Sequence, residues 1–158
     1  MTRRWLILVA ALAVPGLAQK YDGPRPSRAD VPYLKHADNL IATEVTEAKE
    51  EDRKDDILYV IAGANSPART PLASPILLIL ADKVVAQKLQ LFKLESKNGH
   101  REILFSHKKK QTAVPIRIDV TRLSSDNLFQ IEVNESLDKG EYSLSPDGSN
   151  AAFCFQVY

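Results

Sequence analysis

The sequence predicts an all-β fold, an antiparallel β-sandwich of about seven to nine strands that follows a signal peptide and a flexible lead-in. Short apolar or alternating runs recur through residues 40–158, and turn signals separate them at intervals of about ten residues. The alternation places apolar side chains on one face of each strand and polar side chains on the other, as a half-buried strand requires.

The first 18 residues have the composition of a secretory signal peptide. Arg3 and Arg4 form a basic start, residues 5–14 are apolar, and small residues precede a cleavage site before Gln19. Ten apolar residues are too few to cross a bilayer as a helix, which takes about 20. We expect a secreted or periplasmic protein with no transmembrane segment after cleavage; an uncleaved N-terminal anchor is the alternative.

Charge and cysteine content exclude several classes of protein. Removal of residues 1–18 takes away two basic residues and no acidic one, so the formal net charge changes from +1 to −1. A chain without a basic surplus has no field that attracts nucleic acid. Cys154 is the only cysteine, so no internal disulfide can form. We expect this thiol to be buried and inert, with an intermolecular disulfide or a reactive thiol as alternatives.

The N-terminal part of the mature chain is rich in proline and charge. We expect residues 19–39 to form a flexible extension and residues 40–158 to form the β-sandwich domain. Alternation over residues 40–47 favours an edge strand, and the charged run that follows is expected to be a solvated connection. A short helix over residues 43–54 is the alternative, because this run is dense in helix formers.

Two apolar segments predict central strands. Residues 57–62 end at a glycine, and the proline-rich loop of residues 65–75 that follows is expected to be pinned and largely extended. Residues 76–80 are all apolar, which is typical of a strand covered on both faces. A helix over residues 76–93 competes with this interpretation, since Pro75 suits a first helical position.

The remaining strands are expected to form hairpins. The Asn98-Gly99 pair favours a tight turn between strands over residues 89–94 and 101–107. Residues 114–120 have the clearest period of two, and residues 129–133 return antiparallel to them. Residues 151–158 form the predicted last strand after a turn at Pro146-Asp147-Gly148. Cys154 would then face away from Phe153 and Phe155.

The spacing Leu137-x-x-Gly140-x-Tyr142 resembles the tyrosine corner of immunoglobulin-like and fibronectin-type-III sandwiches. That resemblance implies a hydrogen bond from the Tyr142 hydroxyl to nearby backbone, with Leu144 where antibody domains have a cysteine. The chain also resembles small uncharacterised secreted bacterial proteins that share a GEYxLSPDGSN…FCF ending and a preceding LQLFKLESKNGHRE hairpin. This second resemblance covers most of residues 40–158 and implies context and fold, but no activity.

The sequence yields no catalytic, cofactor-binding or metal-ligating residue set. Ser66 and Ser74 lie in the proline-rich loop with no patterned base, and the paired acids Glu50-Glu51 and Asp55-Asp56 suit a solvated surface. A hairpin would bring His100 near Glu102, yet a zinc site generally needs three or four ligands. The other two histidines, His36 and His107, are scattered.

The leading hypothesis is a non-enzymatic interaction or structural module of the cell envelope, which uses the loop of residues 65–75 or an edge strand. Its expected partner is an envelope or extracellular protein, and a homo-oligomer is the other form of assembly considered. The alternative is a small-ligand or carbohydrate-binding domain. Sugar platforms need exposed aromatic rings, and the candidate rings are Tyr33, Tyr59, Phe92, Tyr142 and Tyr158.

Overall fold

The computed structural model describes residues 20–108 and 112–158, which form β-strands and one short 3₁₀ helix, η1 (Ala86–Lys88). The prediction of an all-β, antiparallel fold is therefore confirmed for this part of the chain. The predicted signal peptide lies outside the described residues. In the part described there are thirteen strands, more than the seven to nine expected, because several of them are short.

The first sheet has five strands, and all its pairs are antiparallel. In spatial order the strands are β10 (Ile118–Ser124), β11 (Leu128–Val133), β7 (Ile76–Leu80), β1 (Tyr33–His36) and β2 (Asn39–Ala42). The apolar strand β7 lies in the centre with Leu77, Leu78 and Ile79 fully buried, as the sequence predicted.

The second sheet has eight strands. Its order is β3 (Glu44–Glu47), β13 (Ala151–Val157), β12 (Gly140–Pro146), β8 (Leu89–Lys97), β9 (His100–Ser106), β5 (Asp56–Ala62) and β4 (Lys49–Arg53). The short strand β6 (Arg69–Thr70) pairs in parallel with the end of β13, so the proline-rich loop forms part of the sheet edge.

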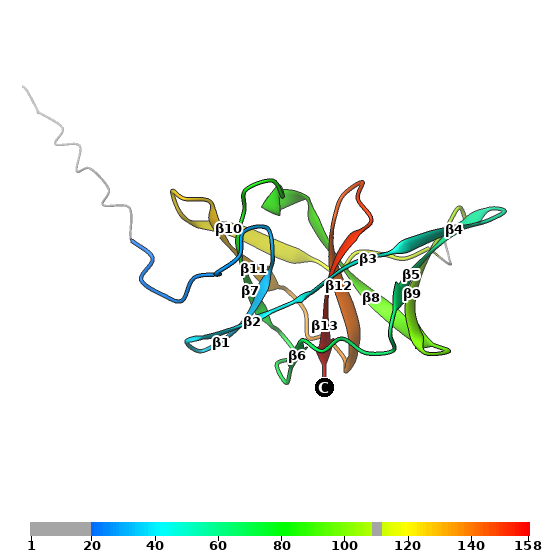
Figure 1. The fold of residues 1–158 in the computed structure, drawn as a ribbon, viewed down its shortest axis with the longest axis horizontal. Coiled ribbons are helices and arrows are strands. Elements are labelled where there is room, and N and C mark those ends of the chain that lie inside the picture. Colours follow the sequence, from blue (N-terminus) through cyan, green and yellow to red (C-terminus); the bar gives the residue numbers. More distant parts are fainter. Residues whose placement is uncertain (1–19, 109–111) are drawn as a thin grey trace, which may run out of the picture.

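One extended stretch joins the two ends of this second sheet. Strand β3 pairs with β13, and β4, which follows after the single residue Ala48, pairs with β5. The strands β4, β5 and β9, which we call the wing, therefore fold back over β8, β12 and β13. In Figure 1 the wing lies at the right and the five-stranded sheet at the left, with β12 and β13 between them.

Two apolar clusters follow from this arrangement. The larger one fills the space between the two sheets, with Leu91 of β8, Leu144 of β12 and Phe155 of β13 facing Leu77 and Ile131. The smaller one lies on the opposite face of the second sheet, under the wing, and consists of Ile61, Leu94, Ala152 and Cys154. Strands β8 and β13 are therefore covered on both faces.

The ordered domain begins earlier than residue 40. The sequence predicted a flexible extension over residues 19–39, but β1 lies between β7 and β2 in the five-stranded sheet. Leu34 is fully buried there, and Asp30 accepts hydrogen bonds from the backbone N–H groups of Asp82, Lys83 and Val84. The prolines before residue 33 favoured the prediction of a flexible segment. Pairing with β7 and β2 nevertheless makes residues 33–36 a strand.

The charged run after residue 47 is a strand and not a connection. It forms β4, which turns at Lys54 (φ 54°) and pairs with β5 over residues 49–60. The helix alternatives over residues 43–54 and 76–93 are also excluded, because β3, β4, β7 and β8 occupy these segments. The strand expected over residues 114–120 begins at Ile118, while Ile116 forms an isolated bridge with Leu91.

The tyrosine corner, the Asn98-Gly99 turn and Cys154 have the predicted geometry. The Tyr142 hydroxyl donates to the Asp138 carbonyl oxygen at 2.7 Å, which confirms the hydrogen bond expected of the corner. Asn98 and Gly99 adopt φ of 52° and 80°, as a tight hairpin turn requires. Cys154 is buried and faces away from Phe153 and Phe155, into the cluster under the wing.

Candidate functional site

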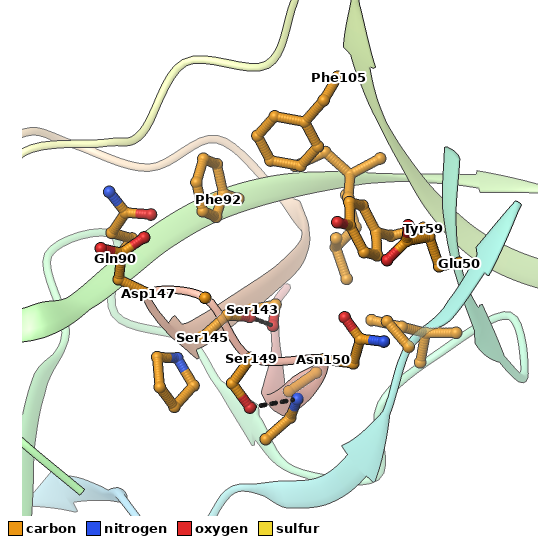
Figure 2. A pocket seen from close by; sticks show the side chains of 18 of the residues that line it. Glu50, Tyr59, Gln90, Phe92, Phe105, Ser143, Ser145, Asp147, Ser149 and Asn150 are labelled. Carbon is orange, nitrogen blue, oxygen red and sulfur yellow. Dashed lines mark hydrogen bonds between the residues drawn. The ribbon is translucent and has the colours of Figure 1, made fainter. Parts of the chain in front are cut away.

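A cleft of about 460 Å³ lies between the wing and the outer face of β8, β12 and β13. It exists because β8 and β9 diverge: they pair only between residues 95–97 and 100–102, close to their turn. Beyond this point no backbone ladder joins the two strands, and side chains such as Phe92 of β8 and Phe105 of β9 line the space between them. Figure 2 shows side chains from both strands pointing into the cleft.

Three aromatic rings form the apolar wall of the cleft. Phe105 lies edge-on to Tyr59, with ring centroids 5.6 Å apart and an interplanar angle of 87°. It also lies edge-on to Phe92, at 5.4 Å and 82°. Edge-to-face contacts of this kind stabilise ring positions by about 0.5–1.5 kcal/mol beyond burial. The wall is therefore preorganised across the gap between wing and sheet.

Polar side chains lie beside this wall, on strand β12, where Ser143 is in register with Phe92 of β8. Ser143 and Ser145 alternate on β12, and their hydroxyl oxygens are 3.0 Å apart. The turn that follows, residues 146–150, forms the rim, and Gly148 adopts the left-handed φ of 72° that this turn needs. The hydroxyls and the rim offer hydrogen-bonding groups to a molecule that lies against the rings (Figure 2).

A buried ion cluster lies beside the cleft. Arg101 is fully buried, and its guanidinium donates to both carboxylate oxygens of Glu44 at 2.6 and 3.0 Å. It also donates to the carbonyl oxygens of Ala62 and Gly63 at 2.7 and 2.9 Å. Arg101 lies two residues from Ile103 on the same face of β9, so the cluster adjoins the lining of the cleft.

Glu141 is a second buried carboxylate beside this arginine. One of its oxygens accepts from the Ser66 backbone N–H at 2.9 Å and lies 3.8 Å from the Arg101 guanidinium. Burial raises the pKa of Glu141, although the Ser66 N–H and Arg101 act in the opposite direction. Burial also raises the pKa of the Cys154 thiol, to about 11. A thiol with so high a pKa is a poor nucleophile near neutral pH.

The serines and histidines considered in the sequence do not form one site. Ser66 donates its hydroxyl to the Cys154 carbonyl at 3.1 Å, and Ser74 donates to the Glu135 carbonyl at 3.3 Å. The Nε2 atom of His100 lies 2.7 Å from a carboxylate oxygen of Glu102. This hydrogen bond holds the pKa of the Glu102 carboxyl below its ordinary value. The ring of His36 bonds instead to the Thr70 hydroxyl, at 2.8 Å.

The paired acids separate onto different faces. Glu51 lies on the outer face of β4, 3.4 Å from Arg53, whereas Glu50 lines the cleft. Asp56 accepts from the Ser106 hydroxyl at 2.6 Å. Only Glu50 of these acids therefore contributes to the candidate site.

Sequence reasoning did not find the cleft. Tyr59 and Phe92 were predicted only as candidate rings of a sugar platform, and no role was predicted for Ser143 and Ser145. One signal was available: in LQLFKL the two faces of β8 are both apolar, with Leu89 and Leu91 on one and Phe92 and Leu94 on the other. Such a strand needs a cover on each side, and the wing is the second cover.

Comparison of the chain with protein-family models, with curated proteins and with solved structures finds no match. Within residues 20–108 and 112–158, no group of three or more His, Cys, Asp or Glu side chains is placed to hold a metal ion. The same residues contain no helix with the length and apolar character that a membrane crossing takes.

Proposed function

We propose that the protein is a non-enzymatic binding protein that holds a small, largely apolar molecule in the cleft under the wing. One observation carries the proposal: three aromatic rings and two serine hydroxyls line a single space of about 460 Å³. Small-molecule sites have volumes of about 300–1,000 Å³, with apolar walls and a few polar groups that orient the ligand.

The proposed setting is the secreted or periplasmic space. The composition of residues 1–18 supports it. An immunoglobulin-like relationship is also part of the proposal. The Leu137, Gly140 and Tyr142 spacing, together with the hydrogen bond from Tyr142 to Asp138, supports it.

An interaction module of the cell envelope has weaker support. The loop of residues 65–75, expected to present a binding surface, instead packs inward at Ser66, Ala68 and Thr70. The exposed large apolar residues come from separate segments of the chain: Val45, Leu72, Val85, Val114 and Tyr158. A sugar platform on Tyr158 is also disfavoured, since the Arg69 guanidinium covers its ring at 4.2 Å.

A blocking variant tests the proposal. Ser145→Trp places a large ring inside the cleft, and Thr121→Trp places the same ring on the exposed strand β10 as the matched control. Saturation-transfer NMR with 1-naphthalenemethanol should show binding to the wild type and to the control, and its loss in Ser145→Trp. The proposal is wrong if the probe does not bind the folded wild type, or if it binds Ser145→Trp equally well.

A further inference from the structure

The charges around the cleft specify the ligand further, on the basis of the proposed binding function. Among the described residues that line the cleft, none is Lys, Arg or His, while Glu50 and Asp147 both belong to the lining. Glu50 comes from the wing and Asp147 from the turn between β12 and β13. Carboxylates thus flank the cleft on its two sides (Figure 2).

The basic residues of the wing lie on its other face. Strand alternation puts Lys49, Glu51 and Arg53 on the outer side of β4 and Glu50 on the cleft side. Glu51 is 4.0 Å from Lys49 and 3.4 Å from Arg53, so these cations are engaged there. Within the described part of the chain, no ion pair neutralises Glu50 or Asp147.

Negative charge beside the cleft also acts on the Tyr59 hydroxyl. Its pKa is raised above the ordinary value, first by burial and then by the negative charges of Glu50 and Asp52. Anions are disfavoured at such a place, and a cation placed beside the ring is attracted by the same two carboxylates. The ring faces of Tyr59, Phe92 and Phe105 add to this attraction, because an aromatic face carries negative charge density.

We infer that the cleft selects an organic cation, an ammonium group carried on an apolar body. The apolar body fits against the aromatic wall, and the ammonium group is attracted by Glu50 and Asp147, which flank the cleft. Ser143 and Ser145 offer hydroxyl oxygens as acceptors for the N–H groups of the ligand. Rings and carboxylates together are the chemistry by which proteins hold ammonium groups.

Three probes with one ring system separate charge from apolar binding. They are 1-naphthylmethylammonium, neutral 1-naphthalenemethanol and anionic 1-naphthylacetate, titrated into the full chain by calorimetry at low and at physiological salt. The cation should bind roughly tenfold more tightly than the anion at low salt, with the alcohol between them. Added salt should narrow that difference, because the rim carboxylates are exposed.

Paired variants locate the selectivity. The double variant Glu50→Gln/Asp147→Asn should lose most of the preference for the cation and keep its affinity for the alcohol. The matched control Asp119→Asn/Glu132→Gln removes two exposed carboxylates that face each other on β10 and β11, and should keep the preference. Binding of all three probes with equal affinity, or tightest binding of the anion, overturns the inference and leaves the binding function standing. Failure of every probe to bind overturns the binding function itself.

Discussion

The side chains of Arg101 and Glu44 form a two-pronged ion pair, with Nη1 and Nη2 at 2.6 and 3.0 Å from the two carboxylate oxygens. Arg101 belongs to β9 of the wing, and Glu44 belongs to β3, which pairs with β13. The pair therefore joins the wing to the main sheet beside the cleft. The guanidinium is fully buried, so its charge depends on Glu44 and, at the longer distance of 3.8 Å, on Glu141.

Loss of the Glu44 charge should destabilise the fold. In Glu44→Gln, the buried guanidinium keeps a hydrogen-bond acceptor but loses its nearer counter-charge, and Glu141 remains at 3.8 Å. We expect the free energy of unfolding to fall by roughly 2–3 kcal/mol, at or below the low end of the range for breaking a buried pair, since the Glu44 side chain is 21% exposed. Urea denaturation measures this. An unchanged midpoint would show that Glu141 and the carbonyls of Ala62 and Gly63 satisfy Arg101 without the Glu44 charge.

The same substitution at Glu141 should behave differently. In Glu141→Gln, the new side-chain amide oxygen would still accept from the Ser66 N–H, and Arg101 lies farther from this position, at 3.8 Å. We expect Glu141→Gln to change the free energy of unfolding by less than about 1 kcal/mol near neutral pH. This contrast with Glu44→Gln is the matched comparison, because both variants remove one charge beside the same arginine.

The raised pKa of Glu141 also predicts a pH dependence. A carboxyl with a higher pKa in the folded state than in the unfolded state stabilises the fold at low pH, and this contribution is lost as pH rises. The stability of the wild type relative to Glu141→Gln should therefore decline as pH increases from about 4.5, the ordinary value for a glutamate. Denaturation at several pH values between about 4 and 7 measures the difference. A difference that grows in favour of the wild type with pH would contradict the prediction.

Local signals predicted the parts of the fold that local chemistry determines. The Asn98-Gly99 turn has its own conformational preference, and the hydrogen bond from Tyr142 to Asp138 spans only four residues. Strand β4 of the wing had no such signal. Both faces of β4 are polar, so no alternation of apolar and polar residues indicates a strand there. Only its pairing with β5 makes residues 49–53 a strand. The cleft depends on the divergence of β8 from β9, which is a tertiary property.

The tyrosine corner should contribute measurably to stability. Tyr142→Phe removes the hydroxyl that donates to the Asp138 carbonyl at 2.7 Å and leaves the buried ring in place, stacked on Phe155. We expect a loss of about 1 kcal/mol in the free energy of unfolding, the usual net value of one hydrogen bond. Tyr158→Phe serves as the control, because that ring is half exposed. Equal losses of unfolding free energy in the two variants would show that the Tyr142 hydrogen bond does not stabilise the fold.

The Cys154 thiol should be inert in the native protein. It is fully buried under the wing beside Ile61 and Leu94, and its pKa is raised to about 11, chiefly by burial. We expect a disulfide reagent at neutral pH to label the thiol only after denaturation, and non-reducing electrophoresis to show no dimer.

The raised pKa of the Cys154 thiol also implies that its contribution to stability is retained below about pH 9, the ordinary value, and is lost as pH rises towards 11. The variant Cys154→Ala has no thiol to ionise, so the same rise in pH should cost it less stability than it costs the wild type. Rapid labelling of the native protein would show instead that the wing opens often enough to expose the apolar cluster beneath it.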